Sequence, residues 1–92
     1  DDFRIAKIGL SMGAIQYNNG DYLSSIGSFE LTVSQSEIEV LTLEKGYFYL
    51  GNAYFQVDLS DKAREAFRNA YDLNGQYRRV AKSYLDVISL TD

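Results

Sequence analysis

Apolar residues recur along this chain at intervals of three and four, the spacing of residues that share one face of an α-helix. The strict alternation of apolar and polar residues that marks a half-buried strand is missing. Clusters of polar residues and glycine interrupt the helical spacing at 18–21, 34–36, 58–61 and 74–75. The pattern therefore predicts an all-α fold, with helices near residues 3–18, 22–33, 37–57, 61–73 and 76–90.

Residues at the expected helix starts support these limits. Ser36 followed three residues later by Glu39 has the form of a capping box. Asp21, and either Ser60 or Asp61, have side-chain oxygens that accept hydrogen bonds from the first free amides of a helix. We therefore expect side-chain caps on the second, third and fourth helices.

Between residues 47 and 75 the chain resembles a tetratricopeptide repeat, a helix-turn-helix unit that stacks into an α-solenoid. The resemblance is carried by Tyr47, Leu50, Gly51, Tyr54, Ala63, Phe67 and Ala70. The small residues suit the closest approach of two antiparallel helices, and the large ones fill the remaining space. The family often ends the repeat with proline, whereas this chain has Gly75, which is expected to stop the helix in the left-handed conformation.

A shift of 38 residues exposes a weaker first copy of the same pattern. The pairs that it aligns are Gly13 with Gly51, Phe29 with Phe67, Met12 with Leu50, Ser25 with Ala63 and Thr32 with Ala70. This predicts a degenerate repeat over 3–34 and a second repeat over 37–75. Because the offset exceeds the family's 34 residues, the first helix of the second repeat is expected to be longer by one turn, about 5–6 Å.

The last segment places Leu85 where the repeat needs a glycine, so residues 76–90 are interpreted as a C-terminal capping helix. The alternative is the first half of a further repeat in a longer array. The chain does not begin with methionine, which suggests an excised domain. The resemblance as a whole implies one domain over 1–92, a right-handed stack of two repeat units and the capping helix.

Composition narrows the function. The chain has 92 residues, 46% of them hydrophobic, and a formal net charge of −4, which argues against nucleic acid as a partner. Histidine and cysteine are absent, so the common general base, the thiol nucleophile and the usual zinc ligands are missing. No apolar run reaches membrane-spanning length. We expect no enzyme activity, no cofactor and no metal site; Glu37, Glu39 and Glu44 are interpreted as a solvated helix start.

The resemblance implies that the first helix of each pair lines a concave groove that binds a protein or peptide. The shift of 38 residues, together with a shift of 34 residues from the second copy to the last segment, aligns a basic row of Lys7, Lys45 and Arg79, which suits an acidic or C-terminal carboxylate peptide. They also align a mixed apolar row and a small polar row, and place Tyr17 and Phe55 one turn further on. The mixed row is Leu10, Phe48 and Lys82, and the small polar row is Ala14, Asn52 and Asp86. The Asn52 side chain is expected to form hydrogen bonds with a peptide backbone. The alternative interpretation of the basic row is an ordinary solvated helix edge with surface cations.

A second hypothesis is structural self-association into a homo-oligomer. It would use Tyr84, Leu85 and Ile88, or the face that carries Gly9 and Gly13. Exposed aromatic residues would favour it, because a contiguous apolar patch is usually covered by a partner or by a second copy. The aromatic residues that are hardest to bury in the predicted fold are Tyr17, Tyr49, Phe55 and Tyr77.

Overall fold

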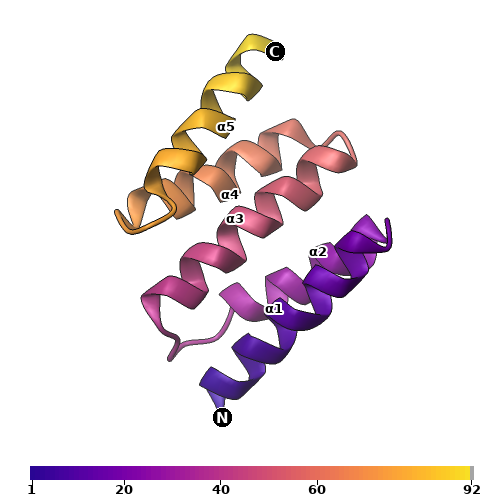
Figure 1. The fold of residues 1–92 in the computed structure, drawn as a ribbon, viewed down its shortest axis with the longest axis vertical. Coiled ribbons are helices and arrows are strands. Elements are labelled where there is room, and N and C mark those ends of the chain that lie inside the picture. The colour runs from indigo at the N-terminus through magenta and orange to yellow at the C-terminus, as the bar shows by residue number, and fades with distance from the viewer. Residues whose placement is uncertain (92) are drawn as a thin grey trace.

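The computed structural model describes residues 1–91, and these form five α-helices and no strand. The helices are α1 (Asp2–Asn18), α2 (Tyr22–Val33), α3 (Val40–Gln56), α4 (Ser60–Asp72) and α5 (Arg78–Thr91). Each helix packs against the next one in the sequence, and α1 also contacts α3. The helices therefore follow one another along the molecule, which measures 40 × 29 × 17 Å, and the described chain starts and ends at opposite ends (Figure 1). The predicted all-α class and the order of five helices are confirmed.

The prediction that α3 starts at residue 37 with a Ser36–Glu39 capping box is wrong. The helix begins at Val40, and Glu39 at its N-cap makes no side-chain capping bond. The cause lies in α1, because the Asp2 carboxylate accepts a hydrogen bond from the Glu37 backbone N–H at 3.0 Å. This contact holds the linker before α3 against the first helix and delays the helix start.

Two further terminal predictions are wrong and one is confirmed. Asp21 caps α2 by accepting a hydrogen bond from the Ser24 N–H at 3.4 Å. The cap of α4 is Leu59 and makes no side-chain bond, so neither Ser60 nor Asp61 has the expected role. After α4 the left-handed residue is Asn74, with φ 57°, and not Gly75. Asparagine tolerates this conformation, so the left-handed backbone of the turn does not require a glycine.

The 38-residue offset reappears in the helix positions. Helices α1 and α3 each have 17 residues and begin 38 positions apart, at Asp2 and Val40. Helices α2 and α4 begin at Tyr22 and Ser60, again 38 apart. The expected extra turn in the first helix of the second repeat is therefore absent. The additional residues lie in the linker between α2 and α3.

Both hairpins close around a glycine and a buried phenylalanine, as the aligned pairs predict. A Cβ on Gly13 would lie 2.4 Å from Cε1 of Phe29, and a Cβ on Gly51 would lie 2.7 Å from Cε1 of Phe67. Distances this short exclude a side chain at either glycine, so each phenylalanine ring lies directly against the opposite helix backbone. Both rings are buried.

The face of α1 that carries Gly9 is also covered by α2. A Cβ on Gly9 would lie 2.5 Å from Oγ1 of Thr32, and that hydroxyl donates to the Ala6 carbonyl at 2.8 Å. Helix α2 therefore occupies the Gly9–Gly13 face within one molecule. The hypothesis that this face binds a second subunit is wrong.

Glu44 is buried, with only 2% of its surface exposed, and is not part of a solvated helix start. Its carboxylate accepts a hydrogen bond from the Tyr77 backbone N–H at 3.2 Å, at the start of α5. A Cβ on Gly75 would lie 2.0 Å from Glu44 Oε1, so glycine is needed there to admit the carboxylate. Glu44 thus anchors the α4–α5 turn to α3.

Helix α5 packs on α4 and buries Ala81 and Ile88, while Tyr84 and Leu85 are half-buried. The Tyr84 ring stacks on Phe67, with centroids 5.0 Å apart. Because Ile88 is only 1% exposed, the set Tyr84, Leu85 and Ile88 is not a free surface for self-association.

Candidate functional site

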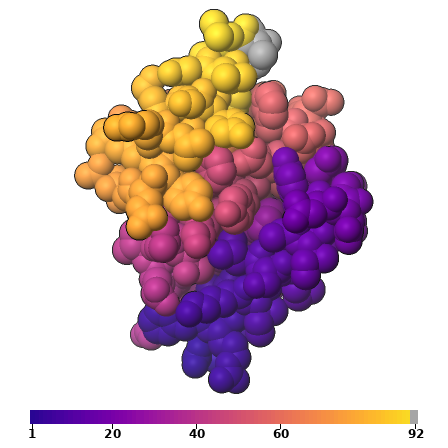
Figure 2. Space-filling model, in the orientation of Figure 1, coloured from indigo at the N-terminus to yellow at the C-terminus, as the bar shows by residue number. Residues whose placement is uncertain are grey.

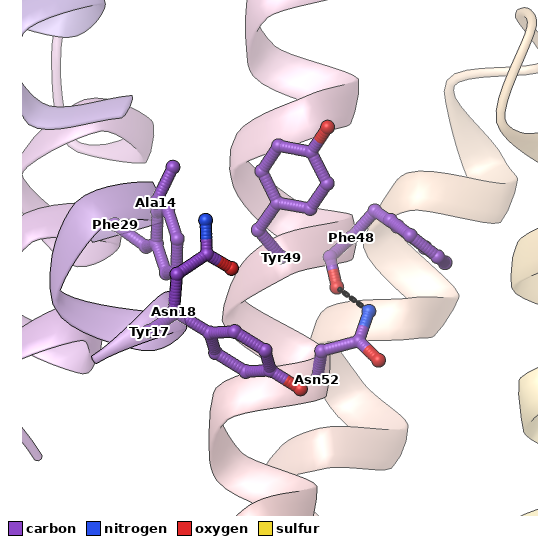
Figure 3. Close-up of a pocket in the computed structure, with 7 residues that line it drawn as sticks. All are labelled: Ala14, Tyr17, Asn18, Phe29, Phe48, Tyr49 and Asn52. Carbon is purple, nitrogen blue, oxygen red and sulfur yellow. Dashed lines mark hydrogen bonds between the residues drawn. The ribbon is translucent and has the colours of Figure 1, made fainter. Parts of the chain in front are cut away.

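A cavity of about 310 Å³ opens between α1 and α3 (Figure 3). Four aromatic rings, two asparagine amides and one small residue line it. They are Ala14, Tyr17, Asn18, Phe29, Phe48, Tyr49 and Asn52. We call this space the aromatic cavity.

Helical spacing explains how these side chains meet. On α1, Ala14, Tyr17 and Asn18 lie at positions i, i+3 and i+4, so they share one face. On α3, Phe48 and Asn52 are four residues apart and face the same side. The methyl group of Ala14 leaves the space between the two helices unfilled.

The aromatic walls are held by contacts with one another and with rings outside the cavity. Tyr49 packs against Phe29 with ring centroids 5.7 Å apart, and against Phe48 at 5.8 Å. Phe48 in turn contacts Phe67, Tyr77 and Tyr84 with centroids between 5.2 and 5.8 Å apart. Walls fixed in this way lose little conformational entropy when a ligand binds.

Tyr17 lines the cavity and connects the two helices. Its hydroxyl accepts a hydrogen bond from Gln56 Nε2 at 3.2 Å, and its ring meets Tyr22 edge-on with centroids 5.1 Å apart. The Tyr17 O–H remains available as a donor, because the bond to Gln56 uses only an acceptor position.

Two amides supply the polar groups of the cavity. Asn52 Nδ2 donates to the Phe48 carbonyl of its own helix at 3.0 Å, and no described residue donates to its Oδ1. Figure 3 shows the Asn18 amide turned toward α3. An amide carries both donors and an acceptor, so the pair suits the N–H and C=O groups of an extended peptide.

Only part of the predicted binding set gathers at this cavity. Tyr17, Phe48 and Asn52 line it, whereas Leu10 and Phe55 are half-buried and pack against the core. Lys45 is half-buried and lines none of the hollows described here.

The other predicted cations lie elsewhere. Lys7 lies 3.5 Å from a Glu39 carboxylate oxygen and borders a hollow on the outer side of α1. Arg79 and Lys82 border a different hollow beside α4 and α5. Lys82 pairs with Asp86 at 2.6 Å, a contact that raises the pKa of the lysine. The row predicted from the offsets is therefore divided between separate surfaces.

Sequence reasoning missed Phe29 as a wall, because the offset assigned it to the interior of the first hairpin. Its ring reaches the cavity through the notch at Gly13. The signal that could have found it is the glycine itself, since Ala14, the next residue on α1, lines the cavity beside the notch that the ring fills. Tyr49 was also absent from the predicted binding set. Its signal was its place in the sequence, directly after the predicted groove residue Phe48, and the difficulty of burying its side chain in the predicted fold.

Two tyrosines outside the cavity walls have altered acidity. Burial, followed by the hydrogen bond that the Tyr54 hydroxyl donates to Glu30 at 3.1 Å, raises the pKa of Tyr54 to about 12. Burial and a hydrogen bond with Tyr49 raise the pKa of Tyr77 to about 12. Both tyrosines thus keep their protons well above neutral pH.

Within residues 1–91, no helix is both long enough and apolar enough to cross a membrane. The same part of the chain contains no group of three acidic, histidine or cysteine side chains that could hold a metal ion. Comparison with known protein families, with curated proteins and with solved structures gives no match to this chain.

Proposed function

We propose that this protein is a non-enzymatic interaction module that binds an extended segment of a partner protein in the aromatic cavity. The observation that carries the proposal is the cavity of about 310 Å³ between α1 and α3, with fixed aromatic walls and two asparagine amides. Its volume is at the lower end of the range for ligand pockets, about 300–1,000 Å³. That size suits one large apolar side chain of a peptide.

The proposal includes a tetratricopeptide-like arrangement, a right-handed stack of two hairpins closed by α5. The common 38-residue offset of the helix starts supports it, as do the two glycine–phenylalanine contacts at Gly13 and Gly51. In such a stack the first helices, α1 and α3, line the concave side. The aromatic cavity lies between these two helices.

The partner segment is proposed to be acidic or to end in a carboxylate. Lys7 and Lys82 are already paired with Glu39 and Asp86. Lys45 and Arg79 form no ion pair that the described residues show, so they are the cations left to receive an anionic peptide. Their contribution is expected to be steering and orientation, with the apolar contact supplying most of the affinity.

The cavity is tested with a phage-displayed random peptide library, and the enriched peptides are then measured by titration calorimetry. Ala14→Phe fills the cavity, and it should weaken the enriched peptides at least about tenfold, because the pocket for their anchor side chain is lost. Ser24→Phe adds the same ring at an exposed position of α2 and serves as the matched control. Enriched peptides that bind Ala14→Phe as tightly as the wild type would contradict the cavity as the binding site.

The charge preference is tested separately with the double variant Lys45→Glu and Arg79→Glu. We expect it to slow association and weaken binding of acidic peptides from the same library, while the helical circular dichroism stays unchanged. Retained affinity in the double variant would exclude the cations from recognition without excluding the cavity.

A further inference from the structure

Helix α1 has a second apolar face, on the side away from Leu10, Ala14 and Tyr17, which lie toward α3 and the core. Four residues on it are exposed: Ile5 by 38%, Ile8 by 48%, Met12 by 49% and Ile15 by 63%. We call this set the α1 outer face. Figure 2 shows α1 uncovered along its length at one end of the molecule. An open hollow of about 520 Å³ runs beside the face and is lined in part by Ile8, Met12 and Ile15.

The spacing of the α1 outer face is that of a coiled-coil seam. Ile5, Ile8, Met12 and Ile15 follow one another at intervals of three, four and three residues, which are successive a and d positions of a heptad. A seam of this kind packs against another helix through interdigitating side chains. The face is therefore shaped for a helical partner, and it is separate from the aromatic cavity.

The α1 outer face corresponds in position to the side of α3 that packs against α2, but its residues differ from those of that interface. The equivalent positions on α3 are Leu43, which is half-buried, and Gly46, Leu50 and Ala53, which are buried. A Cβ on Gly46 would lie 2.8 Å from Val33 Cγ1 of α2, so that interface requires glycine. Ile8 stands at the position equivalent to Gly46. A helix placed as α2 is placed on α3 would therefore collide with the Ile8 side chain.

We infer that the α1 outer face is a self-association surface, on which α1 of a second copy of this chain packs antiparallel. A two-fold axis that crosses the α1 outer face at the level of residue 10 places Ile5 opposite Ile15 of the other copy and Ile8 opposite Met12. One seam thus meets itself with every apolar side chain paired, as an isologous dimer interface requires.

Charge favours the antiparallel direction. The acidic start of α1, Asp1 and Asp2, then lies against the uncharged Asn18 and Asn19 of the other copy, and Arg4 lies against Gln16. A parallel pair would bring the two acidic starts side by side. No charged residue stands inside the seam, so the pairing buries no unpaired charge.

The size of the surface sets the strength of the dimer. An exposed patch of this kind covers a few hundred Å², in the range of the largest patch on a typical monomer. Stable complexes bury about 800 Å² on each partner. The dimer is therefore weak and dissociates on dilution.

The test is sedimentation velocity of the full chain over a wide concentration range, with Met12→Glu and Leu90→Glu compared with the wild type. Met12→Glu places two carboxylates in the seam and should raise the dimer dissociation constant at least about 100-fold. Leu90 is 86% exposed on α5 and is the matched control, so its substitution should change nothing. Circular dichroism confirms that both variants fold.

Each other outcome overturns the inference. A monomer at every concentration excludes the dimer. Equal loss of association in Met12→Glu and Leu90→Glu would show head-to-tail packing of α1 on α5, and association that survives Met12→Glu would place the interface elsewhere. The chain has no cysteine, so mixed single-cysteine variants Ile8→Cys and Met12→Cys report the direction. The antiparallel pair predicts a mixed disulfide in preference to either homodisulfide.

Discussion

At the scale of single residues, the two hairpins depend on glycines that admit a phenylalanine ring. Gly51→Ala would place a methyl group 2.7 Å from the Phe67 ring. We expect the free energy of unfolding to fall by about 1–3 kcal/mol, the usual cost of overpacking a core. Chemical denaturation measures the change.

Gly27 gives the matched control for this prediction. It also lies within a helix, but a Cβ there has nothing within 4 Å. Gly27→Ala is expected to stabilise the protein by about 0.5–1 kcal/mol, because alanine loses less backbone entropy than glycine in a helix. If both substitutions had the same sign, the space at Gly51 would not be the cause.

Tyr54 makes the stability depend on alkaline pH. Its pKa is raised from 10.0 to about 12 in the folded state, so the folded protein holds this proton more tightly than the unfolded chain does. The resulting stability is complete below pH 10 and is lost as pH rises toward 12. Tyr54→Phe should make the fall in unfolding free energy across this interval shallower, although Tyr77 still contributes. An unchanged slope in denaturation curves at several pH values would contradict this account.

At the scale of elements, α5 is held by one buried carboxylate as well as by apolar packing. Glu44→Ala leaves the Tyr77 N–H without its acceptor, which costs about 1–3 kcal/mol for a buried donor. Amide hydrogen exchange should accelerate most at the start of α5. Glu39→Ala removes an exposed carboxylate of the neighbouring turn and is expected to change stability by less than about 1 kcal/mol. Equal losses of unfolding free energy in the two variants would contradict the role of Glu44 as the anchor of α5.

The number, order and approximate limits of the helices could be predicted from the sequence, because apolar spacing and turn residues are local signals. The start of α3 could not, since it is set by the bond between Asp2 and the Glu37 N–H across two helices. The burial of Glu44 was missed for the same reason. It requires the turn at Gly75 to fold back over α3, which no local pattern indicates.

At the scale of the whole molecule, the 38-residue offset predicted correctly which helices lie side by side. It did not predict where the charged ends of the lysine side chains lie. Tyr17, Phe48 and Asn52 lie together because α1 and α3 occupy equivalent positions in successive hairpins. Lys7 and Lys82 have long flexible side chains, and each forms an ion pair with a nearby carboxylate. Alignment of backbone positions therefore does not bring their charged groups into one row.

Peptide binding in the aromatic cavity is tested most directly by a nuclear magnetic resonance titration of the labelled protein with one peptide enriched from the library. We predict that amide and side-chain shifts change first at the residues lining the cavity, while those of the α1 outer face stay constant. The lining residues observed are Ala14, Tyr17, Asn18, Phe48, Tyr49 and Asn52. Shift changes confined to the α1 outer face or to α5, with the aromatic cavity unaffected, would contradict it.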